Sequence, residues 1–138
     1  MSLSFEEQRA ATSLISWYAR SIDAADVPGV LECFADEILL SYDGGSLLVA
    51  GKVEVEQFFQ EALRGPSTHL LSNYLFERRG TDIVASCSAI ACVCRNPGFV
   101  TVRGLVYCFT CVFREAAGRI RRLEHSATWE FEVPRGPR

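Results

Sequence analysis

The chain has 138 residues, of which 49% are hydrophobic and 22% are charged, and its formal net charge is -3. This length and composition predict one compact domain with its own hydrophobic core. The slightly negative charge offers no basic surface for nucleic acid or for an anionic membrane. No segment approaches the ~20 apolar residues of a membrane span, and the first residues lack the cationic start of a secretory signal. We therefore expect a cytoplasmic protein that binds a small molecule.

Six cysteines could indicate disulfides or a metal site, but their spacing argues against both. Cys92 and Cys94, like Cys108 and Cys111, lie inside long apolar stretches without the Gly or Pro turns that form metal knuckles. Nothing in the sequence points to an oxidising compartment. We expect buried thiols that act as small hydrophobic side chains, and no metal site.

The first third of the chain has helical periodicity. Apolar residues recur at three- and four-residue steps from about Phe5 to Asp23, which predicts a long amphipathic helix. Asp26 can cap a second helix over residues 27–34, because Pro28 is tolerated in a first turn. The two helices are expected to meet near Asp23.

A short hairpin and a third helix are predicted next. The segments Ile38–Tyr42 and Leu47–Ala50 are typical of short strands, and residues 43–46 of the turn between them. Apolar residues then indicate a helix over residues 53–63, which Gly65 and the following proline terminate.

The rest of the chain is typical of antiparallel sheet, with long segments rich in β-branched and aromatic residues. Helices followed by a long curved meander indicate an α+β fold in which the sheet wraps a helix and leaves a pocket on its concave side. The domain is expected to span residues 1–133, with a loose tail over 134–138. The predicted strands are Thr68–Arg78, Asp82–Arg95, Phe99–Glu115 and Arg119–Val133, with turns at 79–80, 96–98 and 116–118.

Two histidines and one aspartate are the first candidates for chemistry. Strict alternation places His69 and Asn73 on one face of their strand, and His125 and Trp129 on one face of the last strand. Imidazole is the side chain whose unperturbed pKa lies closest to neutrality, although a histidine among apolar neighbours is often a core residue. Asp23 ends an apolar stripe, where it is either a buried carboxylate that needs a partner or an exposed helix end.

Aromatic residues complete the set of candidates. Tyr42, in a short strand, and Tyr18, on the apolar side of the first helix, either pack or serve as proton donors. Trp17 and Trp129 either pack or form a pocket wall. Asn73 could instead satisfy backbone groups in a bulge. The glutamates that alternate with the apolar residues of the last strand are expected to face water or a partner sheet.

The order of elements resembles the nuclear transport factor 2-like superfamily, most closely its SnoaL-like branch, which includes scytalone dehydratase. The segments WYARSID, AGKVEVEQFF, THLLSN and a final TWEF carry this resemblance over nearly the whole chain. It implies a cone-shaped fold with three N-terminal helices packed in a curved, mainly antiparallel sheet that encloses a pocket. It also implies a homodimer through the sheet, with an interface that the aromatic residues of 99–113 could form. Because this fold hosts many activities and some non-enzymes, function depends on the site.

The scytalone dehydratase pattern pairs an aspartate at the end of the first helix with a histidine at the start of the first long strand. Asp23 and His69 occupy those positions, and the tyrosine that polarises the substrate carbonyl corresponds to Tyr42. Two parts of the pattern are missing: a second tyrosine is replaced by Ile22, and a second histidine finds only residues 89–92. These differences argue against scytalone itself as the substrate.

The resulting hypothesis is a lyase or isomerase, similar to a dehydratase, that needs no cofactor and acts on a small hydrophobic polyketide-, aromatic- or steroid-like molecule. His69 is the expected base, Asp23 orients it, and Tyr42 donates to the developing enolate oxygen. The expected substrate contacts are Tyr18, Trp17, Asn73, His125 and Trp129.

Other functions remain open from the sequence. An alignment with ketosteroid isomerase places the basic aspartate of that enzyme on Tyr42, which weakens the hypothesis of isomerisation by the mechanism of that enzyme. A non-catalytic module could bind a hydrophobic ligand or assemble through its sheet. A cyclase or an epoxide hydrolase is a further alternative, but the Asp-Arg-Asp set of a limonene-type epoxide hydrolase is not evident around Arg103.

Overall fold

The computed structural model describes residues 2–114 and 117–136, apart from the side chain of Arg95. Residues 115 and 116, at the predicted end of one strand and in the turn after it, and the last two residues of the predicted tail lie outside this description. The elements are α1 (Phe5–Asp23), α2 (Val27–Glu32), β1 (Phe34–Tyr42), the 3-10 turn η1 (Asp43–Gly45), β2 (Leu47–Ala50), α3 (Lys52–Ala62), β3 (Ser67–Arg79), β4 (Asp82–Asn96), β5 (Phe99–Arg114) and β6 (Ala117–Pro134).

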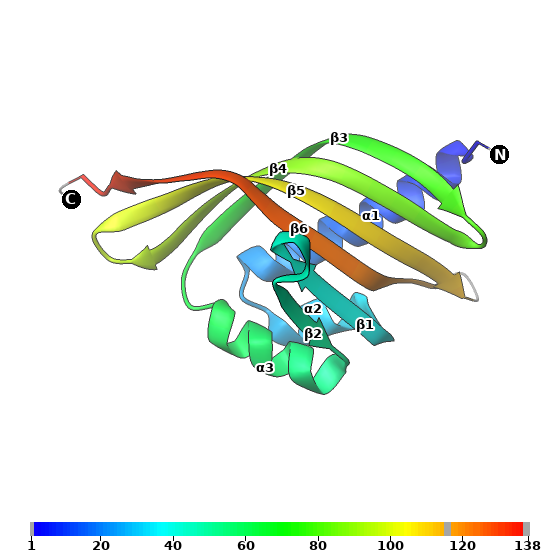
Figure 1. The fold of residues 1–138 in the computed structure, drawn as a ribbon, viewed down its shortest axis with the longest axis horizontal. Helices are drawn as coiled ribbons and strands as arrows, with labels where there is room; N and C mark the ends of the chain where they lie inside the picture. Colours follow the sequence, from blue (N-terminus) through cyan, green and yellow to red (C-terminus); the bar gives the residue numbers. More distant parts are fainter. Residues whose placement is uncertain (1, 115–116, 137–138) are drawn as a thin grey trace.

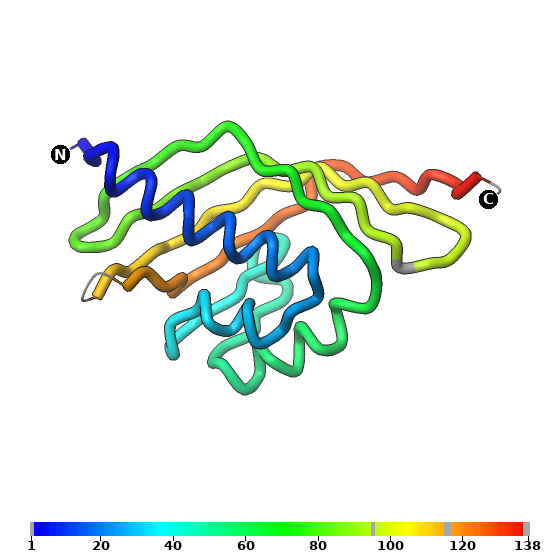
Figure 2. Tube along the Cα trace, turned by 180° about the vertical axis from the view of Figure 1, so that it is seen from behind, coloured from blue at the N-terminus to red at the C-terminus, as the bar shows by residue number. Residues whose placement is uncertain are grey.

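The six strands form one curved sheet in the order β2-β1-β6-β5-β4-β3. Strands β1 and β6 are parallel, and every other neighbouring pair is antiparallel. The sheet curls around α1, while α2 and α3 lie near β1 and β2 (Figures 1 and 2). The α+β architecture, with three helices and a curved sheet, is therefore confirmed.

Local signals define α1 as the sequence predicts. The hydroxyl of Ser4 accepts the backbone N–H of Glu7 at 3.1 Å, and the Glu7 carboxylate accepts the backbone N–H of Ser4 at 2.8 Å. This reciprocal pair satisfies two amide groups that the first turn of a helix leaves unpaired. The helix buries one apolar stripe against the sheet and ends at Asp23.

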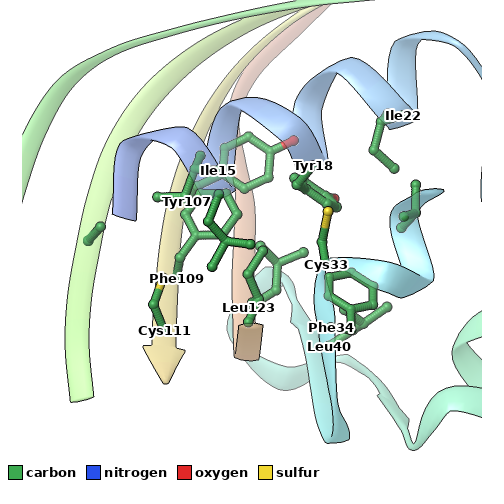
Figure 3. Packing of buried hydrophobic residues seen from close by; sticks show 14 of the residues in the cluster. Ile15, Tyr18, Ile22, Cys33, Phe34, Leu40, Tyr107, Phe109, Cys111 and Leu123 are labelled. Carbon is green, nitrogen blue, oxygen red and sulfur yellow. The ribbon is translucent and has the colours of Figure 1, made fainter. Parts of the chain in front are cut away.

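Aromatic packing holds the second half of α1 against the sheet. Ile15 and Tyr18 face Tyr107 and Phe109 of β5 (Figure 3). The rings of Tyr18 and Phe109 meet edge to face, with their centroids 5.8 Å apart. Each fully buried large side chain contributes roughly 1.5–3 kcal/mol. This packing fixes the last turns of α1, and with them Asp23, relative to the strands.

The second helix is shorter than predicted, since it ends at Glu32 and β1 already begins at Phe34. The helical pattern continues to Phe34, but tertiary pairing overrides it. Phe34 lies opposite Ile120 of β6, and the Cys33 carbonyl accepts the Ile120 N–H at 2.7 Å. The side chain of Phe34 is completely buried. At the other end of the chain, Pro134 belongs to β6 rather than to a tail.

All six cysteines are free thiols. Cys33, Cys87 and Cys111 are buried as expected, but Cys92, Cys94 and Cys108 are only half-buried. The expectation of full burial is corrected for these three, because their side chains alternate onto the outer face of the sheet. Among the residues that the structure describes, no three His, Cys, Asp or Glu side chains gather as a metal site would require. No helix in the described ranges is long and apolar enough to cross a membrane.

Candidate active site

A cavity of about 230 Å³ lies between the concave face of the sheet, the end of α1 and the helix α3. Its volume is somewhat below the ~300–1,000 Å³ of most ligand pockets, which favours a small ligand. Aliphatic and aromatic side chains form much of the wall, including Ile22, Phe58 and Leu105. The polar side chains in the lining are Tyr18, Tyr42, Asp43, Ser67, His69, Arg103, Tyr107 and His125.

Asp23 and His69 meet at the edge of this cavity. Nδ1 of His69 lies 2.6 Å from Oδ1 of Asp23. The other carboxylate oxygen, Oδ2, accepts the backbone N–H of His69 at 3.0 Å, and the hydroxyl of Ser67 donates to Oδ1 at 2.9 Å. The side chains are 12% exposed for His69 and 26% for Asp23, so the pair is shielded but not sealed from water. Three hydrogen bonds therefore hold the carboxylate in place.

This geometry assigns the tautomer of His69. A carboxylate only accepts hydrogen bonds, so Nδ1 carries a proton and donates a hydrogen bond to Asp23. In the neutral imidazole, Nε2 then carries the lone pair and is the nitrogen that can accept a proton. No hydrogen bond within the described residues involves Nε2 of His69. The pair is arranged as a general base with an orienting carboxylate.

Tyr42 reaches the cavity from the end of β1. Its ring stacks on Phe58 of α3, with centroids 5.4 Å apart, and meets the ring of His125 edge-on at 4.8 Å. Burial raises the pKa of Tyr42 above the usual range of a phenol, an effect that the Arg103 charge partly offsets. The hydroxyl therefore stays protonated at neutral pH and can donate a hydrogen bond.

Tyr18 and Tyr107 bring two further phenols to the cavity wall. Tyr18 comes from α1 and is 5% exposed, and Tyr107 comes from β5 and is 3% exposed. Burial is the main cause that raises the pKa of both hydroxyls. The sequence indicates Tyr18 but not Tyr107, although Tyr107 alternates with Leu105 and Phe109 on the core side of β5.

His125 also lines the cavity, as its alternation predicts. Burial, assisted by the positive charge of Arg103, lowers the pKa of His125 to about 4. Its ring is therefore neutral at pH 7, and Nδ1 is buried without a hydrogen-bond partner among the described residues. It lies against Tyr42 and Tyr107, whose ring centroids are 4.8 and 4.9 Å from its own.

Arg103 is a cavity residue that the sequence analysis does not propose. Its side chain is 19% exposed, and its Nε lies 3.3 Å from Oε1 of Glu130. Glu130 is one of the glutamates expected to face water or a partner sheet. Its side chain is 53% exposed, as expected, and it also contacts Arg103. A signal was present in the sequence, since Arg103 alternates with Leu105 and Tyr107.

The predicted contact of Asn73 with substrate is corrected, because a bulge interrupts the alternation of β3. The register shifts between Ser72 and Leu75, and Asn73 has a φ of 58°. Side chains after the bulge exchange faces, so Asn73 is exposed and Leu75 is 73% exposed. The alternative that Asn73 belongs to a bulge is confirmed.

Neither tryptophan lies in the cavity. A bulge at Thr128 of β6 turns Trp129 to the outer face, where it covers Gly104, and its ring stacks on Phe131 at 5.5 Å. Trp17 is 44% exposed on the outer side of α1, in a shallow groove. The expectation of substrate contacts for both residues is therefore corrected.

Comparisons with known proteins agree with this architecture. A structure from Novosphingobium aromaticivorans with the provisional name aromatic ring hydroxylase is 18% identical, with a TM-score of 0.86 over 97% of this chain and 96% of that chain. A provisionally named scytalone dehydratase from the same organism is 16% identical, with a TM-score of 0.81 over 92% and 87%. A type 2 hexachlorocyclohexane dehydrochlorinase is 11% identical, with a TM-score of 0.81 over 91% and 88%.

The TM-scores establish a shared fold, and further structures with it are described as nuclear transport factor 2-like proteins. No curated protein matches the sequence. The model of the SnoaL-like domain family matches residues 4–124, which is most of the chain and includes every polar residue of the cavity except His125. The chain therefore belongs to the SnoaL-like domain family.

Proposed function

We propose that the protein is a cofactor-independent lyase or isomerase that acts on a small hydrophobic polyketide-, aromatic- or steroid-like substrate. The observation that carries this proposal is the 2.6 Å contact between His69 Nδ1 and Asp23 Oδ1 at the edge of the cavity of about 230 Å³. Structures with the provisional name of a dehydratase and with the name of a dehydrochlorinase share the fold, which supports elimination chemistry.

In the proposed reaction, Nε2 of His69 removes a proton from the carbon next to a substrate carbonyl. The C–H electron pair forms a C=C bond while the π pair of the carbonyl moves to its oxygen, and the resulting enolate oxygen accepts a hydrogen bond from the hydroxyl of Tyr42. Asp23 stabilises the imidazolium that forms. The enolate then collapses in one of two ways: it expels the group on the next carbon, a hydroxyl taking the proton from His69 to leave as water, or it takes that proton back from His69 at another carbon. The first outcome is elimination and the second is isomerisation.

Replacement of His69 by alanine tests this mechanism. Wild-type protein is first screened against β-hydroxy ketones and β,γ-unsaturated ketones that carry one or two rings, with product formation followed by absorbance. A general base contributes ~10²- to 10⁴-fold, so His69→Ala should lose at least that factor in kcat/KM. Asn73→Gly, on the same strand but outside the cavity, keeps the backbone conformation and is the matched control, which should retain activity. Near-full turnover by His69→Ala would disprove the role of His69.

A homodimer through the sheet is proposed as the assembly of this protein. Leu70, Ile90, Gly104 and Trp129 lie opposite one another on β3, β4, β5 and β6, and their face of the sheet is opposite to the cavity. Leu70 is 65% and Ile90 46% exposed, so this row leaves a continuous apolar strip uncovered. Sedimentation velocity should show a dimer that Ile90→Glu dissociates. Val53→Glu, at an exposed site on α3, should not change the dimer, and a monomeric wild type would refute it.

A further inference from the structure

Four residues in one row across the sheet connect the two polar ends of the cavity. In the strand register, His69 of β3 lies opposite Ala91 of β4, Ala91 opposite Arg103 of β5, and Arg103 opposite Glu130 of β6. Residues opposite one another project from the same face of a sheet. Two strand spacings, roughly 9–10 Å, therefore separate the backbones of His69 and Arg103. The residue between them is alanine, which leaves room for a ligand above it.

The charged group of Arg103 has unused donors. A guanidinium carries five N–H donors, yet no hydrogen bond in the described part of the chain involves Arg103. Its Nε is buried and has no hydrogen-bond partner among the residues that the structure describes, and Glu130 is its ionic contact. The Glu130 side chain is 53% exposed and so remains in contact with water. A shielded cation with vacant donors is stabilised by any acceptor that enters the cavity.

We propose that Arg103 is a specificity residue that binds a carboxylate of the substrate, so that the cavity accepts an aromatic or alicyclic carboxylic acid. The planar fork of a guanidinium matches a carboxylate with two parallel hydrogen bonds. A ring between the two ends then lies over Ala91 and beside the stacked rings of Tyr42 and Phe58. The position of the reacting carbon at His69 rests on the proposed function, whereas binding of the carboxylate does not.

Glu130, the partner of Arg103, provides a second test, in which the expected change in carboxylate affinity is opposite. The carboxylate of Glu130 neutralises Arg103 in the free protein and competes with the carboxylate of a ligand. Replacement of Glu130 by glutamine removes that competing charge and keeps a side chain of similar size. Carboxylate ligands should therefore bind more weakly to Arg103→Gln and more tightly to Glu130→Gln.

The experiment compares 2-naphthoate with its neutral isostere 2-naphthamide by isothermal titration calorimetry at pH 7. Wild-type protein should prefer naphthoate by about tenfold or more, as expected for charge-assisted hydrogen bonds. Arg103→Gln should abolish that preference and leave the affinity for naphthamide unchanged. Arg122→Gln is the matched control, because Arg122 lies on the same sheet, 47% exposed, and pairs with Glu124.

Three results would overturn the proposal: equal affinities of the wild type for the two probes, binding of neither probe, or a preference for naphthoate that survives in Arg103→Gln. Circular dichroism checks the fold of each variant. If Arg103→Gln does not fold, the Nε–H resonance of Arg103 in the wild type provides the test. It should shift with naphthoate and not with naphthamide, and an unchanged resonance contradicts the proposal.

The outcomes separate this inference from the proposed reaction. His69→Ala should still bind naphthoate with the wild-type preference, because the carboxylate is placed at Arg103. If that preference holds while no substrate is turned over, the carboxylate site stands and the lyase proposal fails. If a neutral substrate is turned over with dependence on His69 but not on Arg103, the lyase stands and the carboxylate site fails.

Discussion

Asp23 and His69 are joined by two hydrogen bonds although they are 46 residues apart in the sequence. Oδ1 of Asp23 lies 2.6 Å from Nδ1 of the imidazole, and Oδ2 accepts the backbone N–H of the same histidine at 3.0 Å. One carboxylate therefore positions both the first residues of β3 and the ring that projects from them. The carboxylate of Asp23 therefore ties the end of α1 to the start of β3 and also selects the tautomer of His69.

Replacement of Asp23 by asparagine should remove this selection. The amide NH₂ can donate to Nδ1, which favours the tautomer with the proton on Nε2, where it blocks the base. We expect kcat/KM to fall by roughly 10²- to 10⁴-fold. Ser67→Ala is the matched control, since it removes one hydrogen bond to Oδ1 and keeps the charge, so its loss should be much smaller. Equal losses in the two variants would contradict the role assigned to Asp23.

Tyr42→Phe should separate the chemistry of the hydroxyl from the packing of the ring. The phenylalanine keeps the stack on Phe58, so the free energy of unfolding should change by no more than about 1 kcal/mol. Loss of a donor to the enolate should lower kcat by roughly 10²- to 10³-fold. Tyr74→Phe, outside the main cavity, serves as the control in the same assays. An unchanged kcat in Tyr42→Phe would remove Tyr42 from the mechanism.

His125 should make the stability of the protein depend on pH. Its folded pKa of about 4 lies below the ordinary value of 6.5, so between these values the unfolded chain binds a proton that the folded chain does not. The contribution of neutral His125 to stability is therefore fully present above about pH 6.5 and is lost as the pH falls toward 4. The two pKa values imply a loss of roughly 3 kcal/mol.

Urea unfolding of wild type and His125→Gln at pH 7.5 and pH 5 measures this effect. Every other ionisable group is common to the two proteins, so the difference between their pH responses isolates His125. We expect the wild type to lose more stability than the variant at the lower pH. Parallel pH responses in the two proteins would show that the folded pKa of His125 is not depressed.

Substitution of Asn73 should change the stability of the protein through the backbone conformation and should leave ligand affinity unchanged. Its φ of 58° is accessible to glycine and asparagine but costs a β-branched residue about 1–2 kcal/mol. Asn73→Val should therefore destabilise the protein in urea unfolding, whereas Asn73→Gly should not. Ser72→Val, one residue earlier, controls for the change in polarity. Affinity for 2-naphthoate should be unchanged in Asn73→Gly, and a loss there would mean that Asn73 contacts the ligand.

The faces of the strands could be predicted by alternation only within stretches that no bulge interrupts. Alternation correctly places His69 on the concave face because it lies before the bulge at Asn73, and it fails for Leu75 beyond that point. The same failure moves Trp129 to the outer face, while His125 stays in the cavity. A bulge adds one residue to one strand, and nothing in a local pattern with a period of two reveals that addition.

Arg103 shows a different limit, because its face was predictable and its importance was not. Leu105 and Tyr107 alternate with it toward the core, so the pattern of β5 already indicates an inward side chain. Its significance depends on the absence of hydrogen bonds between its guanidinium and the described residues, and on the alanine opposite it on β4. Both are properties of neighbouring strands, which the sequence of β5 does not contain.

The local elements of this protein follow from its amino-acid sequence. Apolar periodicity defines α1 and α3, a capping box begins α1, turn residues separate the long strands, and the resemblance to the SnoaL-like branch indicates Asp23, His69 and Tyr42. These signals act within a few residues, where the backbone and its nearest side chains decide the conformation. Which groups share the cavity depends on the tertiary structure. The strand register brings His69, Ala91 and Arg103 into one row, and it is set by hydrogen bonds and packing between segments far apart in the chain.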